Sequence, residues 1–308
     1  MNKIYQTTIA HPVKFEGVGL HTGKVSKIKI LPSNANTGIV FKRIDIKNNN
    51  LVNANYLQVT SAKLCTTLEN KSGVKISTVE HLLAALYISE IDNVLIEINN
   101  EEVPIMDGSA KDFLKVLQKT QIKTFTEKRK FLKVLKKFEL NDGDRKISIE
   151  PSDDSFEVEF QLNYDNKVIG KQKNVVNFEY DNLDEISNSR TFCLYKDIEK
   201  IKKAGLAKGG SLDNAIVVDE DKILNKGGLR NEKEFVNHKI LDLLGDFVLS
   251  GVKILGKVNC YQGGHQLTNI FLRNLFNNAQ VVELSQIEKL KVSEKLGQKT
   301  QLKLAVTA

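Results

Sequence analysis

The sequence predicts an α+β fold that contains two copies of one unit, packed about a pseudo-twofold axis. One observation is that a pattern of strand, turn and strand near the start of the chain recurs near its middle. A second is that an apolar helix led by a histidine and followed by a strand also occurs twice. A third is that the second copy is longer than the first by one block of residues, which indicates an insertion.

The first repeated pattern covers residues 13–43 and 136–162. Each copy runs Lys-Phe-Glu, a polar turn, a strand with alternating apolar residues, Pro-Ser and another strand. In the first copy the alternation includes Ile28 and Ile30. Because alternation with a period of two is typical of a strand with one buried face, we expect a half-buried strand at the same place in both copies.

The second repeated pattern covers residues 80–98 and 237–255. Each copy has a histidine, His81 or His238, near the start of an apolar helix, and each then continues into alternation typical of a strand. The two histidines are therefore expected at equivalent helix starts.

The insertion is located by comparing the spacing in the two copies. Pro32 is 49 residues before His81, whereas Pro151 is 87 residues before His238, so the second copy holds 38 additional residues. We place them within 186–230, here called the insertion, which reads as a short helix followed by a strand at "NAIVVD".

The length of 308 residues suits two domains of ordinary size. The charged stretch "FTEKRK", 125–130, is the expected boundary, which predicts one domain over 1–125 and a second over 126–308. A hydrophobic content of 41% and a charged content of 27% are normal for a globular protein with a core. The net charge of +7 suits an anionic partner, such as a nucleotide diphosphate, RNA or an acidic membrane surface.

The sequence also bears on the cellular compartment. The stretch "MNKIYQTTIAHPVKFEG" has no apolar region of the secretory kind, and no window of 18 uninterrupted apolar residues occurs. Cys65, Cys193 and Cys260 are far apart and form no C-x-x-C pair, which suits a reducing compartment and neither a disulfide framework nor a cysteine-type zinc site. We expect a cytoplasmic protein without a transmembrane segment.

The helix expected in "VNHKILDLLGDFVLS", 236–250, carries His238, Asp242 and Asp246 at steps of four. Side chains at i and i+4 lie about 5–6 Å apart at Cβ, so His238 and Asp242 can reach one ion. Imidazole nitrogen and carboxylate oxygen suit zinc, which keeps three protein ligands in catalytic sites. The alternative is an ordinary solvated polar face opposite the apolar one.

A third ligand has to come from elsewhere in the chain. If the two copies pack about a pseudo-twofold axis, their helix starts face each other, and His81 can join His238 and Asp242. The alternative is that His81 is a capping or surface residue at its helix start.

Two further residues are candidates for proton transfer. Glu80 either acts as the general base toward water activated by zinc, or completes the Ser-x-x-Glu capping box of "STVE". His265, in "YQGGHQLTN", either donates a proton to a leaving amine with its pKa tuned by Asp246, or is an exposed loop histidine.

The glycine-rich stretch "GVGLHTG", 17–23, does not match the dinucleotide-binding pattern. Thr22 stands where the third glycine belongs, and a strand follows instead of a helix. We interpret the stretch as a tight β connection that places His21 near the rim of a site.

Together these segments resemble the UDP-3-O-acyl-N-acetylglucosamine deacetylases, the zinc amidases of lipid A synthesis. The resemblance covers nearly the whole chain, through "GVGLHTG", "LCTTLEN", "ISTVEHLLAAL", "EVPIMDGSA", "SRTF", "GGSLDNAIVVD", "NHKILDLLGD" and "GGHQLTN". It implies two related β/α sandwich domains, each with its own inserted region, and an active site between them.

The resemblance also implies site residues. The implied zinc ligands are His81, His238 and Asp242, and the implied catalytic groups are Glu80 as general base, His265 as general acid, Asp246 to orient it, and Thr191 and Lys239 to bind the polar transition state or substrate. The residues implied to contact the substrate are Phe192, which packs near it, and Leu194, Ile198 and Ala207, which line an acyl-chain passage formed by the insertion.

Three positions depart from the pattern of the family. Gln262 stands where a lysine is common, which leaves the contact to the diphosphate unassigned. Leu83 replaces a polar residue that is often asparagine, and Leu194 is smaller than the aromatic residue common at its place, which affects the expected acyl-chain preference.

The resemblance implies zinc-dependent removal of the acetyl group from UDP-3-O-(hydroxyacyl)-N-acetylglucosamine, which gives acetate and the free amine. The partner is then a UDP-linked acylated glucosamine, and the expected state is a monomer. Two alternatives are a zinc hydrolase of another acetylated sugar and a non-catalytic basic protein that binds nucleotides or RNA. No aromatic RNA-binding motif or arginine-rich tract occurs, so we expect no nucleic-acid partner.

Overall fold

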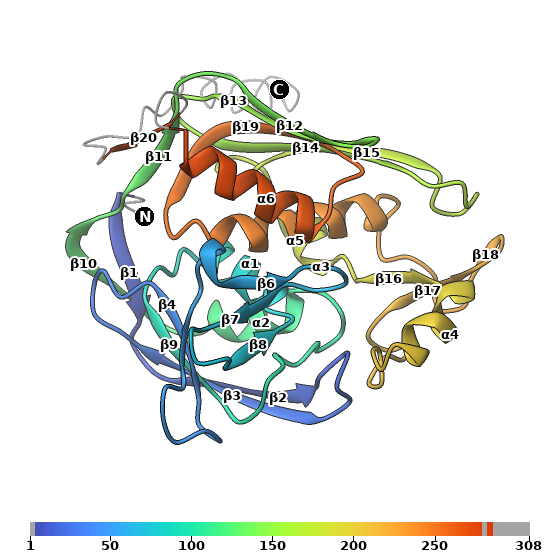
Figure 1. The fold of residues 1–308 in the computed structure, drawn as a ribbon, viewed down its shortest axis with the longest axis horizontal. Coiled ribbons are helices and arrows are strands. Elements are labelled where there is room, and N and C mark those ends of the chain that lie inside the picture. Colours follow the sequence, from blue (N-terminus) through green and yellow to red (C-terminus); the bar gives the residue numbers. More distant parts are fainter. Residues whose placement is uncertain (1–3, 279–281, 286–308) are drawn as a thin grey trace, which may run out of the picture.

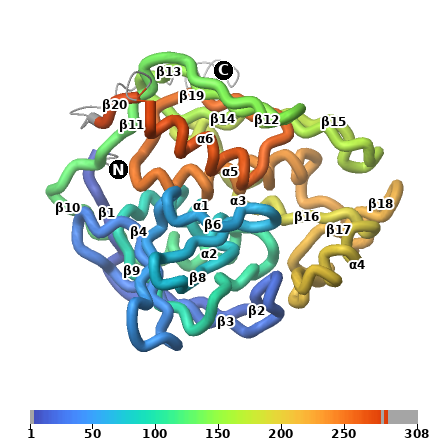
Figure 2. The backbone as a smooth tube through the Cα atoms, viewed as in Figure 1, coloured from blue at the N-terminus to red at the C-terminus, as the bar shows by residue number. Residues whose placement is uncertain are grey.

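The computed structural model describes residues 4–278 and 282–285, so the final part of the predicted second domain, 286–308, lies outside the described residues. The fold is α+β, as predicted, with several separate sheets and a small number of helices. Figures 1 and 2 show the two largest sheets on opposite sides of the molecule, with the main helices between them.

The N-terminal half forms a five-stranded sheet with the order β2-β3-β9-β4-β5. Its strands are β2 (Val13–Val18), β3 (Val25–Pro32), β9 (Val94–Ile98), β4 (Ile39–Arg43) and β5 (Leu51–Asn53). The predicted alternation is present in β3, where Ile28 and Ile30 are buried in the core. Their side chains therefore point to the same face of the sheet, as a period of two requires.

The C-terminal half forms a seven-stranded sheet around β19. Its strands are β11 (Phe131–Val134), β12 (Phe138–Asp142), β13 (Arg145–Pro151), β14 (Phe156–Asn163), β15 (Lys171–Asn177), β19 (Lys253–Tyr261) and β20 (Val282–Ser285). The first residues of β19 pair with β11, and its later residues lie between β13 and β14.

The two sheets share one strand order. In the first, β9 lies between β3 and β4, antiparallel to β3 and parallel to β4. In the second, β19 lies between β13 and β14 with the same directions. The outer pairs, β2 with β3 and β12 with β13, are both antiparallel, and so are β4 with β5 and β14 with β15. A duplicated unit predicts this correspondence.

The layer between the sheets contains four helices (Figure 1). They are α1 (Glu80–Ile88), α2 (Lys111–Leu117), α5 (Glu234–Val248) and α6 (His265–Phe276). The interpretation of α5 as a helix with one solvated face is wrong, because His238, Asp242 and Asp246 are buried together with its apolar residues. Buried charges need partners, so the polar row of α5 must be satisfied inside the molecule.

The stretch predicted as a domain boundary is largely a paired strand. β10 (Ile122–Lys128) runs antiparallel to β1 (Tyr5–Ile9) at the side of the molecule, where the chain passes from the first half to the second (Figure 1). The next residue, Arg129, is buried and forms ion pairs with Glu90 and Asp92. The crossing segment is thus anchored to the first half.

The insertion projects from one side of the molecule (Figure 1). It contains α3 (Asp184–Asn188, which starts just before it), β16 (Phe192–Leu194), α4 (Tyr195–Lys203), β17 (Ile216–Asp219) and β18 (Lys222–Ile223). The predicted short helix corresponds to α4, and the strand predicted at "NAIVVD" is β17.

The first half carries a smaller addition of its own. Three short strands form a separate sheet after the 3-10 helix η1 (Tyr56–Gln58): β6 (Val59–Ser61), β7 (Thr67–Glu69) and β8 (Lys75–Ser77). Among the described residues, no helix is both long enough and apolar enough to span a membrane.

Candidate metal centre and active site

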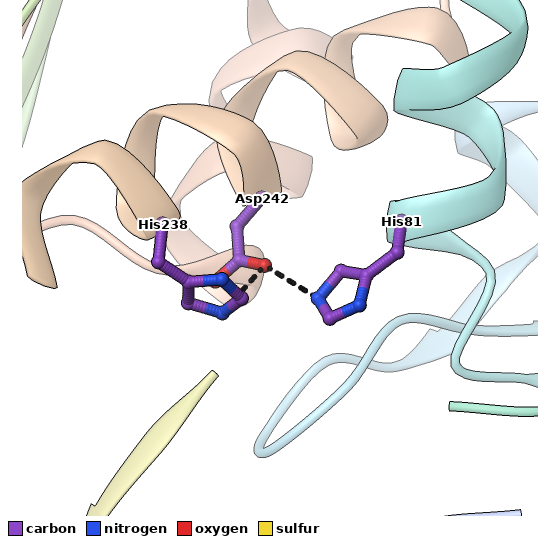
Figure 3. Close-up of side chains that lie close together, drawn as sticks. All are labelled: His81, His238 and Asp242. Atoms are coloured by element: carbon purple, nitrogen blue, oxygen red, sulfur yellow. Dashed lines mark ion pairs between the residues drawn. The ribbon is translucent and has the colours of Figure 1, made fainter. Parts of the chain in front are cut away.

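Three candidate ligands meet where the start of α1 faces the middle of α5 (Figure 3). The Nε2 atoms of His81 and His238 each lie 3.3 Å from Oδ1 of Asp242. One ligand atom from each residue lies within 4.8 Å of the others, and all three residues are buried. The i, i+4 pair comes from α5 alone, whereas His81 is brought to it from the other half of the chain.

The close approach of the two helices depends on Gly245. A Cβ atom at this position of α5 would lie 2.1 Å from the carbonyl oxygen of Glu80, the first residue of α1. Any side chain here would push the helices apart, because atoms of real side chains do not approach backbone oxygen so closely. The glycine therefore allows His81 to reach Asp242.

The protonation states of His238 and Asp242 suit ligands of a cation. Burial lowers the pKa of His238 to about 3, so its ring is neutral and can offer a lone pair. Its Nδ1 lies 3.2 Å from the carbonyl oxygen of Ser189, which assigns the proton to Nδ1 and leaves Nε2 free. Although burial opposes ionisation, the ammonium group of Lys239 holds the pKa of Asp242 well below its usual range.

The two oxygens of the Asp242 carboxylate differ in their partners. Asp242 Oδ2 accepts a 2.7 Å hydrogen bond from Lys239, but Oδ1 is buried and receives no hydrogen bond from the described residues. A buried oxygen without a donor is costly. Two imidazoles and one carboxylate that face one point fit the ligand set of a catalytic zinc ion.

Glu80 faces this centre and does not cap α1. The cap position of the helix is Val79, which makes no side-chain capping bond. The hydroxyl of Ser77 donates to the backbone carbonyl of Glu101, so the capping-box alternative is wrong. Oε2 of Glu80 instead accepts a 3.1 Å hydrogen bond from the backbone of Thr66. Burial raises the pKa of Glu80, which makes its carboxylate a stronger proton acceptor.

His265 is the first residue of α6 and is buried, so the alternative of an exposed loop histidine is wrong. Its Nδ1 lies 2.8 Å from Oδ2 of Asp246, and its Nε2 lies 3.8 Å from Oε1 of Glu80. The other oxygen of Asp246 accepts a 2.6 Å bond from the hydroxyl of Thr66. Burial opposes the imidazolium, but Asp246 outweighs it and raises the pKa of His265 to about 9.

These groups line one cavity of about 330 Å³. Nearly all of the residues expected to bind metal, transfer protons or bind the polar transition state are in its wall: Glu80, His81, Thr191, His238, Lys239, Asp242 and His265. Asp246 lies behind His265 and reaches the cavity only through it. His21, which was predicted near the rim of a site, also lines the cavity.

Of the four residues assigned to substrate contact, one lines the cavity and three do not. Phe192 lines the cavity beside Thr191, and its ring centroid is 6.2 Å from that of His238. Leu194, in β16, Ile198, in α4, and Ala207, in the loop that follows, are half-buried, and none of the three is among the described residues that line the cavity. The structure therefore brings only Phe192 to the metal centre.

Two residues that position the site were not assigned a role from the sequence. Thr66 binds both Glu80 and Asp246, and its position within the quoted motif "LCTTLEN" was the only signal for it. Ser189 acts through a backbone carbonyl, which leaves no signal in the residue type. Gln262, where a lysine was expected, is bound to the backbone of Asn163 instead.

Comparisons with known proteins agree with this geometry. Residues 6–277 match the family model described as UDP-3-O-acyl N-acetylglycosamine deacetylase. The chain is 41% identical over 288 residues to the UDP-3-O-acyl-N-acetylglucosamine deacetylase of Pseudoalteromonas translucida (strain TAC 125), which covers 92% of this chain and 95% of that protein. It is 40% identical to the protein of the same name from Shewanella frigidimarina (strain NCIMB 400), over 93% of this chain and 94% of that protein. The chain therefore belongs to the UDP-3-O-acyl N-acetylglycosamine deacetylase family.

Proposed function

We propose that this protein is a cytoplasmic zinc-dependent deacetylase that removes the acetyl group from a UDP-linked 3-O-acyl-N-acetylglucosamine, an early step of lipid A biosynthesis. The reaction gives acetate and the free amine. The names of the relatives support the substrate, and the buried histidine, histidine and aspartate group supports the metal.

The observation that carries the proposal is Oδ1 of Asp242, which lies 3.3 Å from two imidazole nitrogens and has no donor among the described residues. We assign His81, His238 and Asp242 as the zinc ligands. When bound there, zinc supplies a Lewis acid that activates water and polarises the acetamide carbonyl.

Glu80 is assigned as the general base. The backbone N–H of Thr66 holds one of its oxygens, and the other points toward the cavity side of His265. The carboxylate takes a proton from the attacking water, whose oxygen adds to the carbonyl carbon of the acetamide. A buried carboxylate with a raised pKa is a better proton acceptor than an exposed one.

Thr191 and Lys239 are assigned to the charge that develops on the carbonyl oxygen and to the polar part of the substrate. Both line the cavity. Although burial opposes the charge, Asp242 raises the pKa of Lys239 to about 12, so the ammonium group persists at neutral pH. A preorganised donor of this kind is typically worth about 3–4 kcal/mol toward the transition state.

His265 is assigned as the general acid. Asp246 holds its Nδ1, so Nε2 carries the proton that faces the cavity. When the carbon–nitrogen bond of the acetamide breaks, the departing amine nitrogen takes this proton. Asp246 is a positioning residue, because it acts through the imidazole and does not line the cavity.

The acyl chain is assigned to the insertion. Phe192 lies at the metal end of the path, and Leu194, Ile198 and Ala207 extend along β16, α4 and the following loop. The loop lies against the cavity wall, because the N–H of Gly209 donates a 3.0 Å bond to the carbonyl of Leu20, which lines the cavity.

The test removes single ligands and measures metal and activity. We expect His81→Ala and Asp242→Ala to hold much less than one zinc ion per chain, because two protein ligands bind zinc poorly. His11→Ala, which changes an exposed histidine outside the site, is the matched control and should retain both zinc and deacetylation.

Zinc is measured by elemental analysis, and activity by the release of acetate from UDP-3-O-acyl-N-acetylglucosamine. Full zinc occupancy in both ligand variants would overturn the metal assignment. Faster acetate release from an acetylated sugar without the UDP group would instead favour a hydrolase of another substrate, and zinc binding without acetate release would favour a binding protein.

A further inference from the structure

Glu234 is a buried acid with no place in the proposed reaction. It lies in the first turn of α5, four residues before His238, and its exposed fraction is 0%. Its Oε1 accepts bonds from the backbone N of Arg190 (3.1 Å) and from Nε of the same residue (2.8 Å). Its Oε2 accepts bonds from Nη2 of Arg190 (3.1 Å) and from the backbone N of Arg230 (2.6 Å). Four donors on one buried carboxylate form a demanding and specific arrangement.

The donors belong to the two ends of the insertion. Arg190 lies near its start and Arg230 at its end, and Nη2 of Arg190 also binds the carbonyl of Gly228. Glu234 thus joins the two ends of the insertion to each other and to the first turn of α5. Arg230 continues the connection to the first half of the chain, because its Nη2 lies 2.9 Å from Oδ2 of Asp107.

The bond from the backbone of Arg190 has a direct consequence for His238. The N–H of Arg190 and the carbonyl of Ser189 belong to one peptide group, which is planar and rigid. The N–H of that group is held by Glu234, and its carbonyl accepts the hydrogen bond from Nδ1 of His238. One peptide plane therefore bridges two side chains that are one turn apart on the same helix.

The residue after this peptide is Thr191, which lines the cavity. Its backbone N–H donates a 2.8 Å bond to the carbonyl of Gly108, from the first half of the chain. The orientation of the 189–190 peptide thus determines both the carbonyl that faces His238 and the direction in which the chain enters Thr191. In the part of the chain that the structure describes, the carboxylate of Glu234 is the only acceptor for the N–H of this peptide.

We propose that Glu234 is a positioning residue for the metal centre: it orients the 189–190 peptide, which keeps the proton of His238 on Nδ1 and its Nε2 toward the metal, and it places Thr191 at the cavity. This inference rests on the proposed function for the role of Thr191. The part that concerns His238 can be tested through metal binding alone.

The test is Glu234→Gln, with Glu90→Gln as the matched control. Each change removes the carboxylate from an ion pair with a buried arginine, but Glu90 pairs with Arg129, outside the candidate site. We expect Glu234→Gln to weaken zinc binding about 10–100-fold, the usual effect of losing a partner that orients a ligand. The control should lose thermal stability but keep the zinc affinity of the parent.

Arg190→Lys tests whether weaker zinc binding comes from the orientation of the 189–190 peptide or only from lower stability of the protein. This variant loses the forked side-chain contact but keeps the backbone N–H that Glu234 binds. We expect its zinc affinity to stay within a few fold of the parent, even where its melting temperature falls. Zinc affinity is measured by competition with a chelator, and kcat and KM are measured with the acylated substrate. In Glu234→Gln, kcat should fall more than KM rises, because Thr191 acts on the transition state.

The inference fails if Glu234→Gln binds zinc as tightly as Glu90→Gln, or if Arg190→Lys loses as much affinity as Glu234→Gln. Should Glu234→Gln not fold, Glu234→Asp replaces it. That variant keeps the charge but is one methylene shorter, and unchanged zinc affinity there would overturn the inference equally. A parent protein that binds zinc but releases no acetate would overturn the proposed function and leave the zinc comparison valid.

Discussion

His265 shows how two opposed effects on one side chain set the location of a proton. Burial favours the neutral ring, whereas the carboxylate of Asp246, 2.8 Å from Nδ1, favours the imidazolium and outweighs burial. Thr66 holds the second oxygen of Asp246, so the carboxylate cannot turn away. A zinc ion next to the histidine would favour the neutral ring, so in the loaded enzyme we expect a pKa below 9.

A pH profile tests this pair. Activity needs Glu80 ionised, which sets the acid limb, and His265 protonated, which sets the alkaline limb, so kcat/KM against pH should be bell-shaped. In Asp246→Asn the imidazolium loses its charged partner while burial persists, so the pKa of His265 falls and the alkaline limb moves to lower pH. We expect a shift of about one to two units, since a hydrogen bond to a charged group is worth about 1.5–3 kcal/mol.

The control is Asp213→Asn, which makes the same change at an exposed position of the insertion and should keep the profile of the parent. Zinc content is measured in both variants. An alkaline limb that stays in place in Asp246→Asn, with zinc bound, would show that Asp246 does not set the protonation of His265.

At the scale of the element, the insertion is held against the cavity through the loop after α4. Ala207 lies in this loop with a φ of 52°, in the left-handed region, and the next residue of the loop, Lys208, donates its N–H to the carbonyl of His21 at 3.3 Å. A Cβ added at Gly210 would lie 3.7 Å from that of Ala207 and 3.6 Å from Cδ1 of Leu20. The loop is therefore closely packed on the cavity wall, which suits a narrow path for an acyl chain.

A bulky residue in this loop should block the proposed passage. We expect Ala207→Trp to lose turnover of a long-chain substrate while it keeps zinc. In the parent, kcat/KM should change about fourfold for each methylene within the passage, because a buried CH₂ is worth about 0.8 kcal/mol. Lys203→Trp adds the same bulk at an exposed position of α4 and is the control. Unchanged long-chain turnover in Ala207→Trp would place the acyl chain elsewhere.

At the scale of the whole molecule, the site exists because α1 and α5 pack at contact distance. Each helix comes from a different half of the chain, and each half supplies its own sheet on the outside (Figure 1). The contact at Gly245 brings Glu80 and His81 to the row of polar residues on α5. Those residues are buried by this packing, and two residues of the first half contact them: Nε2 of His81 lies 3.3 Å from Asp242, and the hydroxyl of Thr66 donates a hydrogen bond to Asp246.

Gly245→Ala tests whether this packing controls the site. In an ordinary helix the change would stabilise the protein by up to about 1 kcal/mol. Here the new Cβ would clash with the carbonyl of Glu80, so we expect a loss of about 1–3 kcal/mol in the free energy of unfolding and weaker zinc binding.

Gly143→Ala is the control, because its backbone is unfavourable for alanine, with a φ of 58°, but its surroundings are open. It should lose stability without a change in zinc affinity. A Gly245→Ala variant with the stability and zinc affinity of the parent would mean that the helices can separate at no cost to the site.

The sequence by itself determined the features that depend on local geometry. Residue spacing predicts the strand alternation around Ile28 and Ile30, the repeated units, and the helix that carries His238 and Asp242. A period of two or a step of four puts side chains on one face of a strand or helix, whatever that element packs against. The α+β class and the strand at "NAIVVD" follow from the same periodicity.

Only the tertiary structure decided which distant groups meet. "STVE" fits a capping box, yet Glu80 turns to Thr66 and the cavity, because a buried partner was available there. The contact between His81 and Asp242 depends on how closely two helices from different halves pack, and that distance is set by Gly245, not by any spacing along the chain. The carbonyl of Ser189 is backbone, which every residue type has, so only the folded chain could show that it orients His238.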